Sequence, residues 1–287
     1  MRCLISGGET IKKAKMKKLI VFTDLDGTLL DYSTYSFEPA LPALQLIKER
    51  AIPLIICSSK TRKEIEYYRK KLDNHHPFIS ENGGGIYIPK GYFEFGVKSS
   101  EFRVNNEENE YLVMRLGARY SDLRRAIQQL QSEGFNVKGF GDMTAEELAM
   151  LANMNIHEAE MAKDRDFDEP FIFEGNEDQI QKLFKAIKSK GFNFTQGRFF
   201  HILGDSDKGK AVLILIDLYR KKLGDITTIA LGDSPNDIPM LERVDYPIIV
   251  QKYDGNYNQQ IDVPNLIKAD GIGPEGWNKA ILRLLYR

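Results

Sequence analysis

Residues 18–31, KLIVFTDLDGTLLD, decide the fold of this chain, because an apolar run there ends in two aspartates that flank one leucine. The continuous run LIVF at residues 19–22 is typical of a central parallel strand that is covered on both faces. In open α/β sheets, ligands bind beyond the carboxyl ends of such strands. We therefore expect Asp24 and Asp26 to lie at the edge of an active site.

Two carboxylates at this spacing, followed by Gly27, can divide the work of a phosphoryl transfer. A carboxylate is a known nucleophile toward phosphoryl groups, and Mg²⁺ is usually held by one or two carboxylates together with substrate oxygens. We assign Asp24 as the nucleophile. Asp26 is assigned to protonate the leaving oxygen and later to deprotonate the attacking water. The alternative is a solvated turn after a strand, since Asp and Gly are common turn formers.

Length and composition are those of a soluble globular protein with room for two domains: 287 residues, a formal net charge of −1 and two cysteines. The balanced charge gives no indication of a nucleic-acid partner. No apolar run reaches the roughly 20 residues of a membrane span. Cys3 and Cys57 form no metal or disulfide motif. We expect a cytoplasmic protein without nucleic-acid or membrane partners, with residues 1–16 as an N-terminal extension. The oligomeric state stays open.

Strands and helices alternate at both ends of the chain. The apolar strand at residues 53–57 ends in Ser58 and precedes a helix. The alternation resumes with a helix from Lys208 and an apolar strand at residues 226–231, followed by an outer strand at residues 247–250. This pattern predicts an α/β fold whose core is a doubly wound, mostly parallel sheet. The predicted core comprises residues 17–84 and 205–287.

The middle of the chain has a different pattern. Residues 86–97 and 192–203 read as β-hairpins, the first around Pro-Lys-Gly and the second turning near Gly197. Between them lie apolar stripes at helical spacing. We therefore predict an inserted α+β cap domain over residues 85–204, with helices at residues 122–131, 145–153 and 178–190.

Four further polar residues follow strand ends or begin helices. Each has an ordinary alternative: Ser58 as a helix cap, Lys208 as an exposed lysine, Asp233 as a turn residue and Asp237 as a helix start. Together they supply the positioning and charge neutralisation that phosphoryl transfer requires. We expect Ser58 to bind a phosphoryl oxygen and Lys208 to neutralise the nucleophile and the phosphate. The predicted Mg²⁺ site consists of Asp24, a carbonyl at Asp26 and Asp233, with Asp237 orienting the metal shell.

The order of these motifs resembles that of the haloacid dehalogenase superfamily, in members with a large α/β cap after the second motif. Further segments are similar to the mannosyl-3-phosphoglycerate phosphatases of this superfamily, namely CSSKTR at residues 57–62, ENGGG at 81–85, RDFDEPF at 165–171, GRFFHILG at 197–204, DKGKAV at 207–212 and GDSPNDIPML at 232–241. The resemblance implies a Rossmann-like core, Mg²⁺ as cofactor and hydrolysis of mannosyl-3-phosphoglycerate to mannosylglycerate and phosphate. That reaction is a step in the synthesis of a compatible solute.

A small phosphorylated sugar-glycerate substrate needs donors for its carboxylate and hydroxyls. The candidates are Lys60, beside Ser58, and three residues of the cap segments, each with a solvated surface residue as the alternative. Asp142 is a weaker candidate. The predicted substrate-binding residues are Lys60, Arg165, Arg198 and His201.

Three other functions use the same motifs, and the first is a phosphatase of another sugar phosphate. A mutase-type phosphotransferase would return the phosphoryl group to a sugar instead of to water. A non-catalytic sugar-phosphate-binding protein is disfavoured, because Asp24, Asp26, Ser58, Lys208 and Asp233 are all intact.

Overall fold

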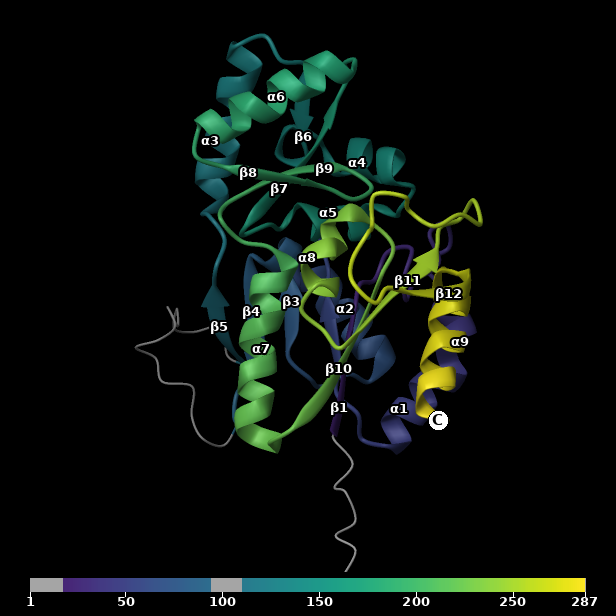
Figure 1. Cartoon of the computed structure of the whole chain (residues 1–287). Helices are drawn as coiled ribbons and strands as arrows, with labels where there is room; N and C mark the ends of the chain where they lie inside the picture. The colour runs from purple at the N-terminus through teal and green to yellow at the C-terminus, as the bar shows by residue number, and fades with distance from the viewer. Residues whose placement is uncertain (1–17, 94–109, 287) are drawn as a thin grey trace, which may run out of the picture.

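The computed structural model of this chain describes residues 18–93 and 110–286, and within them a large sheet forms the lower part of the molecule (Figure 1). Its strands are β1 (Lys18–Thr23), β2 (Leu54–Cys57), β3 (Phe78–Ser80), β4 (Gly85–Pro89), β5 (Tyr111–Arg115), β10 (Ile226–Gly232), β11 (Tyr246–Gln251) and β12 (Ile267–Ile272). They lie in the order β12-β11-β10-β1-β2-β3-β4-β5. Pairing is parallel from β12 to β3 and antiparallel for β4 and β5. The predicted mostly parallel sheet is therefore confirmed.

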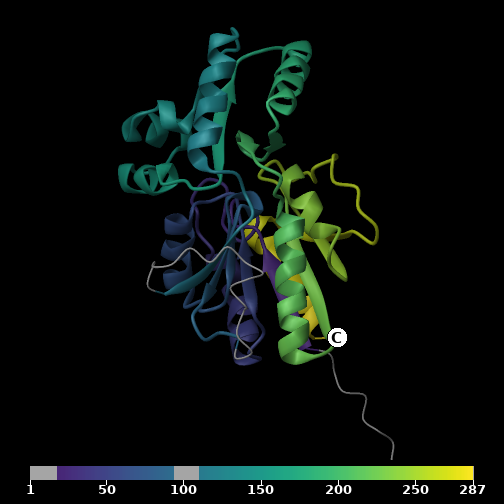
Figure 2. The same ribbon diagram turned by 90° about the vertical axis from the view of Figure 1, so that its left-hand side faces the viewer.

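Helices cover both faces of this sheet, as Figure 2 shows from the side. Ile20 and Phe22 of the central strand β1 are buried in the same core as α7, whereas Val21 points into the core formed by α1, α2 and α9. Successive side chains of a strand point to opposite faces, so a strand covered on both sides must be apolar at every position. The helices of this part are α1 (Leu41–Glu49), α2 (Arg62–Leu72), α7 (Lys208–Leu223), α8 (Ile238–Leu241) and α9 (Gly273–Leu285).

The cap forms a second lobe above the carboxyl ends of the core strands (Figures 1 and 2). Its antiparallel sheet has the order β6-β7-β9-β8, with β6 (Val137–Gly139), β7 (Asp168–Phe173), β8 (Asn193–Gln196) and β9 (Phe200–Leu203). Two helices, α3 (Tyr120–Ser132) and α6 (Glu177–Ser189), share an apolar core with this sheet. A helix pair, α4 (Ala145–Ala152) and α5 (Ile156–Lys163), packs beside it, and α5 lies against α2 of the core.

The chain passes from the core to the cap later than the sequence predicts. Strand β4 pairs with β3 on one side and with β5 on the other, so both β4 and β5 extend the core sheet. The reason is the turn at Glu81 and Asn82, whose positive φ angles of 48° and 54° reverse the chain within one sheet. The predicted boundary at residue 85 therefore moves to the end of β5. Residues 94–97 of the predicted hairpin and the 1–16 extension lie outside the described residues.

The sequence pattern misses several elements, among them β12 and α5. Strand β11, expected to be the outer strand, has β12 as a further neighbour. In β12 the exposed Lys268 and Asp270 alternate with the buried Ala269 and Gly271, which leaves little apolar signal. Helix α5 buries Ala159, Met161 and Ala162, and these neighbouring positions give no stripe at helical spacing. Within the described parts of the chain, no helix combines the length and the apolar character needed to cross a membrane.

One titratable group of the fold leads to a pH prediction. Burial, together with Arg69 and Lys222, lowers the pKa of His76 from 6.5 to about 4. The unfolded chain therefore takes up a proton near pH 6.5 that the folded chain takes up only near pH 4. We predict that the free energy of unfolding falls by roughly 3 kcal/mol as the pH is lowered through this window, and that His76→Asn removes this loss. Urea denaturation between pH 7 and pH 4 measures it.

The matched control is His157→Asn at an exposed histidine of α5, which should keep the wild-type pH dependence. Parallel curves for wild type and His76→Asn would contradict the prediction.

Candidate active site

The predicted catalytic residues converge where the carboxyl ends of three core strands face the cap. Asp24 directly follows β1, Ser58 follows β2, and Asp233 follows β10. Lys208 is the first residue of α7, where the chain returns from the cap. Parallel neighbours end at one edge of a sheet, which is why residues so distant in sequence meet here.

Lys208 is the buried centre of this group. Its Nζ donates to Oδ1 of Asp24 and to Oδ1 of Asp237, each at 2.7 Å. Burial by itself would lower the pKa of Lys208, but the two carboxylates outweigh it and raise this pKa above the ordinary value. The other oxygen of Asp237 accepts from the backbone N–H groups of Asp233 and Ser234 at 3.0 and 3.1 Å. Asp237 thus links Lys208 to the backbone of the loop after β10.

Three carboxylates form a group with the spacing of a metal site. Oxygens of Asp24, Asp233 and Asp237 lie within 4.8 Å of one another, and all three residues are buried. Burial, with the neighbouring carboxylates, raises the pKa of Asp24 to about 7 even though Lys208 opposes it, and raises that of Asp233 well above its ordinary value. Buried carboxylates in excess of one lysine leave negative charge that a divalent cation would neutralise. Oxygen ligands of this kind fit Mg²⁺.

The local backbone holds Asp233 close to the first loop. Thr28 Oγ1 donates to Oδ1 of Asp233 at 3.2 Å. Gly27 has a φ of +73°, and a Cβ there would lie 2.9 Å from Oδ2 of Asp233. Only glycine combines this left-handed conformation with so close an approach.

The Asp26 carboxylate is not one of the three grouped carboxylates. Its Oδ2 lies 3.1 Å from Nζ of Lys60, and it lines the cleft described below. The predicted Mg²⁺ site uses a carbonyl at Asp26, which stays a prediction, while Lys60 holds the Asp26 carboxylate. Ser58 is fully buried, and its Oγ accepts from the backbone N–H of Lys60 at 3.3 Å.

A cleft of about 330 Å³ connects Asp24 and Asp26 with the cap. From the cap, Arg198 reaches into it and donates from Nη1 to the Tyr35 hydroxyl at 2.9 Å. The Arg198 guanidinium also lies 5.1 Å from the centre of the Tyr32 ring. The sequence prediction missed several of the lining residues, namely Tyr32, Gln196, Lys252, Tyr253, Asn258 and Gln260.

Lys252 and Tyr253 were predictable in principle, because they follow β11, a parallel neighbour of β10. The rule that ligands bind at the carboxyl ends of strands would have found them.

Arg165 and His201 lie elsewhere, in a buried link between cap and core. Arg165 donates from Nη2 to the backbone oxygen of Ser59 at 2.8 Å and from Nε to Oδ1 of Asp168 at 2.7 Å. His201 Nδ1 lies 3.0 Å from Oδ2 of Asp168. Neither residue lines the cleft. Asp168 on β7 holds Arg165 and the Nδ1 atom of His201, and the role of these two residues as substrate ligands stays a prediction.

Asp142, the weaker candidate, accepts from the backbone N–H of Gly139 at 2.9 Å and from Gln131 Nε2 at 3.0 Å. It forms part of the cap structure and does not line the cleft.

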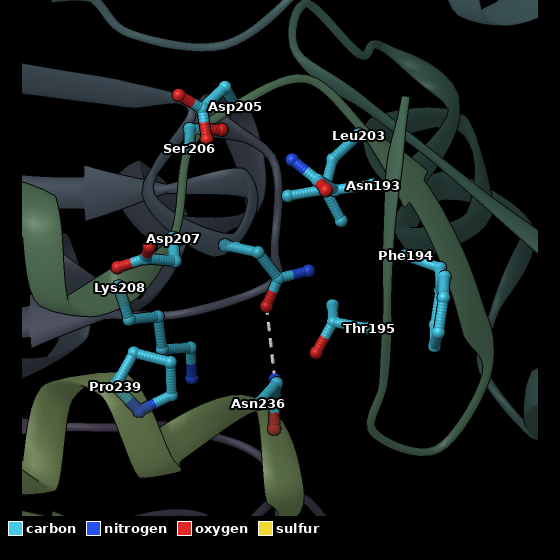
Figure 3. Close-up of a pocket in the computed structure, with 11 residues that line it drawn as sticks. Asn193, Phe194, Thr195, Leu203, Asp205, Ser206, Asp207, Lys208, Asn236 and Pro239 are labelled. Carbon is cyan, nitrogen blue, oxygen red and sulfur yellow. Dashed lines mark hydrogen bonds between the residues drawn. The ribbon is translucent and has the colours of Figure 1, made fainter. Parts of the chain in front are cut away.

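A second cavity of about 280 Å³ lies behind the site, between β8 and the chain segment that leads into α7. Figure 3 shows Thr195, Lys208 and Asn236 among the side chains around it. Asn236 also lines the main cleft, and its Nδ2 donates to Oδ1 of Asn82 at 3.0 Å, the dashed line in Figure 3. Asn236 therefore borders both the cleft and the second cavity.

Comparison with known proteins identifies the class to which this site belongs. The chain matches the model of the haloacid dehalogenase-like hydrolases over residues 21–258 and belongs to that family. It is 47% identical over 270 residues to the glucosyl-3-phosphoglycerate/mannosyl-3-phosphoglycerate phosphatase of Methanococcoides burtonii, covering 93% of this chain and 97% of that protein. It is 41% identical over 254 residues to the mannosyl-3-phosphoglycerate phosphatase of Pyrococcus horikoshii, covering 87% and 99%. Both resemblances predicted from the motifs are confirmed.

Solved structures agree on the fold. A Thermoplasma acidophilum protein superposes with a TM-score of 0.66 at 15% identity, covering 94% of this chain and all (100%) of the other. The phosphatase-superfamily protein BT1666 of Bacteroides thetaiotaomicron gives 0.63 at 17% identity and 98% coverage of both chains.

The three grouped carboxylates predict that a substitution among them raises the stability of the metal-free protein and weakens metal binding. Asp233→Asn removes one of the three buried carboxyl groups, so above the raised pKa of Asp233 the repulsion without metal falls. We expect the melting temperature without Mg²⁺ to rise by roughly 2–4 °C, and the further rise that Mg²⁺ causes in the wild type to disappear. Thermal melting followed by circular dichroism, with and without MgCl₂, measures both effects.

The control is Asp217→Asn, an exposed aspartate of α7. It should leave both melting temperatures as in the wild type. A full Mg²⁺ response in Asp233→Asn would exclude Asp233 as a ligand.

Proposed function

We propose that this protein is a Mg²⁺-dependent phosphatase that hydrolyses mannosyl-3-phosphoglycerate to mannosylglycerate and phosphate through an aspartyl-phosphate intermediate. The observation that carries the proposal is the buried Asp24 carboxylate at the base of a cleft, held by Lys208 beside Asp233 and Asp237. The names of the relatives supply the substrate. Two of them also name the glucosyl compound, so glucosyl-3-phosphoglycerate is the second expected substrate.

In the first half of the reaction a carboxylate oxygen of Asp24 attacks phosphorus. The bond between phosphorus and the glycerate C3 oxygen breaks, and that oxygen takes a proton from the Asp26 carboxyl group. Mannosylglycerate leaves, and the phosphoryl group remains on Asp24.

In the second half a water molecule attacks phosphorus and transfers a proton to the Asp26 carboxylate. The bond between phosphorus and Asp24 breaks, phosphate leaves, and both aspartates return to their starting states.

The surrounding groups balance charge during these steps. The Lys208 ammonium, 2.7 Å from Asp24, lies where it can neutralise both the nucleophile and an equatorial phosphoryl oxygen. The Ser58 hydroxyl accepts from Lys60, which leaves its proton for a phosphoryl oxygen. A bound Mg²⁺, held by Asp24, Asp233 and Asp237, would supply further neutralisation of phosphate charge.

The alternatives have less support. The relatives are named phosphatases, which favours water over a sugar as the final acceptor. A non-catalytic binding protein would have no need for a buried aspartate with the charged partners of Asp24.

The covalent mechanism predicts the effect of replacing the nucleophile. Asp24→Asn should lower phosphate release by more than roughly a thousandfold, because an amide does not attack phosphorus. The measurement is phosphate release with Mg²⁺ from mannosyl-3-phosphoglycerate, glucosyl-3-phosphoglycerate, 3-phosphoglycerate and mannose 6-phosphate. The first two should be strongly preferred by the wild type.

Substantial turnover by Asp24→Asn would contradict the covalent mechanism. Similar rates with all four substrates would support phosphatase activity and contradict the assigned substrate.

We propose Arg198 as the cap residue that binds the substrate carboxylate, because its side chain lines the cleft. Arg198→Ala should raise KM for mannosyl-3-phosphoglycerate roughly tenfold or more, the worth of one charge-assisted hydrogen bond, and should leave KM for 4-nitrophenyl phosphate nearly unchanged. Steady-state kinetics on both substrates measures this. Arg125→Ala, an exposed arginine of α3, is the control. An equal change in both KM values would exclude Arg198 from carboxylate recognition.

A further inference from the structure

Lys60 is a buried cation placed beside the expected acid/base residue. Its residue exposure is 6%, and its Nζ lies 3.1 Å from Oδ2 of Asp26 and 3.2 Å from Oε1 of Glu64. The rings of Tyr35 and Tyr68 lie 5.2 and 5.7 Å from the same nitrogen. Carboxylates and aromatic faces therefore surround the ammonium, and Lys60 is not among the residues that line the cleft.

Glu64, which contacts the Lys60 ammonium, is itself held by hydrogen bonds. Glu64 Oε2 accepts from the backbone N–H of Thr61 at 2.9 Å, and the backbone N–H of Glu64 donates to Thr61 Oγ1 at 3.3 Å. This capping box fixes the first turn of α2. The Thr61 hydroxyl in turn donates to the backbone oxygen of Met161 in the cap at 2.9 Å. Glu64 is thus a second, fixed carboxylate that holds the ammonium besides Asp26.

The two oxygens of Asp26 differ because of this arrangement. Oδ2 meets Lys60, whereas Oδ1 is buried and has no hydrogen-bond partner. A buried oxygen without a partner has a free energy cost and calls for an explanation. The contact with Lys60 instead fixes the orientation of the carboxyl group of Asp26, whose side chain is 32% exposed and lines the cleft.

We infer that Lys60 is a positioning residue for Asp26, which orients the carboxyl group for proton exchange with the leaving oxygen and with the attacking water. This inference rests on the proposed function. It replaces the expectation that Lys60 binds the substrate.

The inference has a chemical consequence that depends on the leaving group. Cleavage of the sugar-glycerate ester expels an alkoxide, which needs the Asp26 proton as the bond breaks. An aryl phosphate such as 4-nitrophenyl phosphate expels a stable phenolate, so its first step needs no proton. Hydrolysis of the phosphoenzyme requires the base in either case. A misoriented Asp26 should therefore slow the first step only for the sugar substrate and the second step for both.

The test is rapid-mixing kinetics on Lys60→Met with Mg²⁺. With mannosyl-3-phosphoglycerate, formation of the phosphoenzyme should slow roughly tenfold to a hundredfold, within the range of general acid catalysis. With 4-nitrophenyl phosphate, nitrophenolate should appear in a burst equal to the enzyme concentration at the wild-type rate, followed by slow turnover. Lys63→Met, the same change at an exposed lysine of α2, is the matched control and should match the wild type.

A double-mutant cycle separates action through Asp26 from an independent role. Lys60→Met added to Asp26→Asn should cause no further loss in the first step with the sugar substrate. Should Lys60→Met fail to fold, Lys60→Arg serves for the same comparison, because it keeps the buried charge and moves the donor atoms.

Additive losses would overturn the inference, as would a raised KM for the sugar substrate with an unchanged rate of phosphoenzyme formation. If the wild type forms no phosphoenzyme with either substrate, the proposed function fails first, and this outcome differs from both of the others.

Discussion

The buried ammonium of Lys208 is the constraint on which the rest of the active site depends. It meets Asp24 after β1 and Asp237 after β10 at 2.7 Å each. A charge removed from water is tolerated only when it is paired, and loss of one partner leaves the other charge uncompensated. Two neighbouring strand ends and the start of α7 are therefore held in a single arrangement. The carboxylates that this places around Asp24 are too many for one lysine, which is why the site suits a divalent cation.

A second buried polar group joins the cap to this site. Glu81 Oε2 accepts from the backbone N–H groups of Asp166, Phe167 and Asp168 at 3.1, 2.8 and 3.0 Å. Asn82 donates to Asp168 at 2.8 Å and accepts from Asn236, in the loop that carries Asp233 and Asp237. Glu81 and Asn82 both have positive φ, a conformation that persists only where the surroundings fix it. Hydrogen bonds thus connect the position of the cap with that of the loop that carries Asp233 and Asp237.

Sequence reasoning located the catalytic residues better than the substrate residues. Asp24, Lys208, Asp233 and Asp237 meet as predicted, because each belongs to a strand end or a helix start and parallel strands end at one edge. For Arg165 and His201 the pattern showed cations in cap segments but gave no direction for their side chains. Their partner Asp168 lies on β7, and this contact depends on how the cap strands pair. The cleft residues Lys252 and Tyr253 were missed, although they follow a strand of the same sheet.

The sequence by itself determined the doubly wound core, the presence of a cap and the class of chemistry. These follow from apolar runs, motif spacing and residue types, which are properties of short segments. Only the tertiary structure decided where the core ends, since β4 and β5 join the core sheet through pairing and not through their own pattern. It alone decided that Lys60 faces Asp26 and that Arg198 faces the cleft. The direction of a side chain is set by contacts with segments distant in the chain, and no local pattern records them.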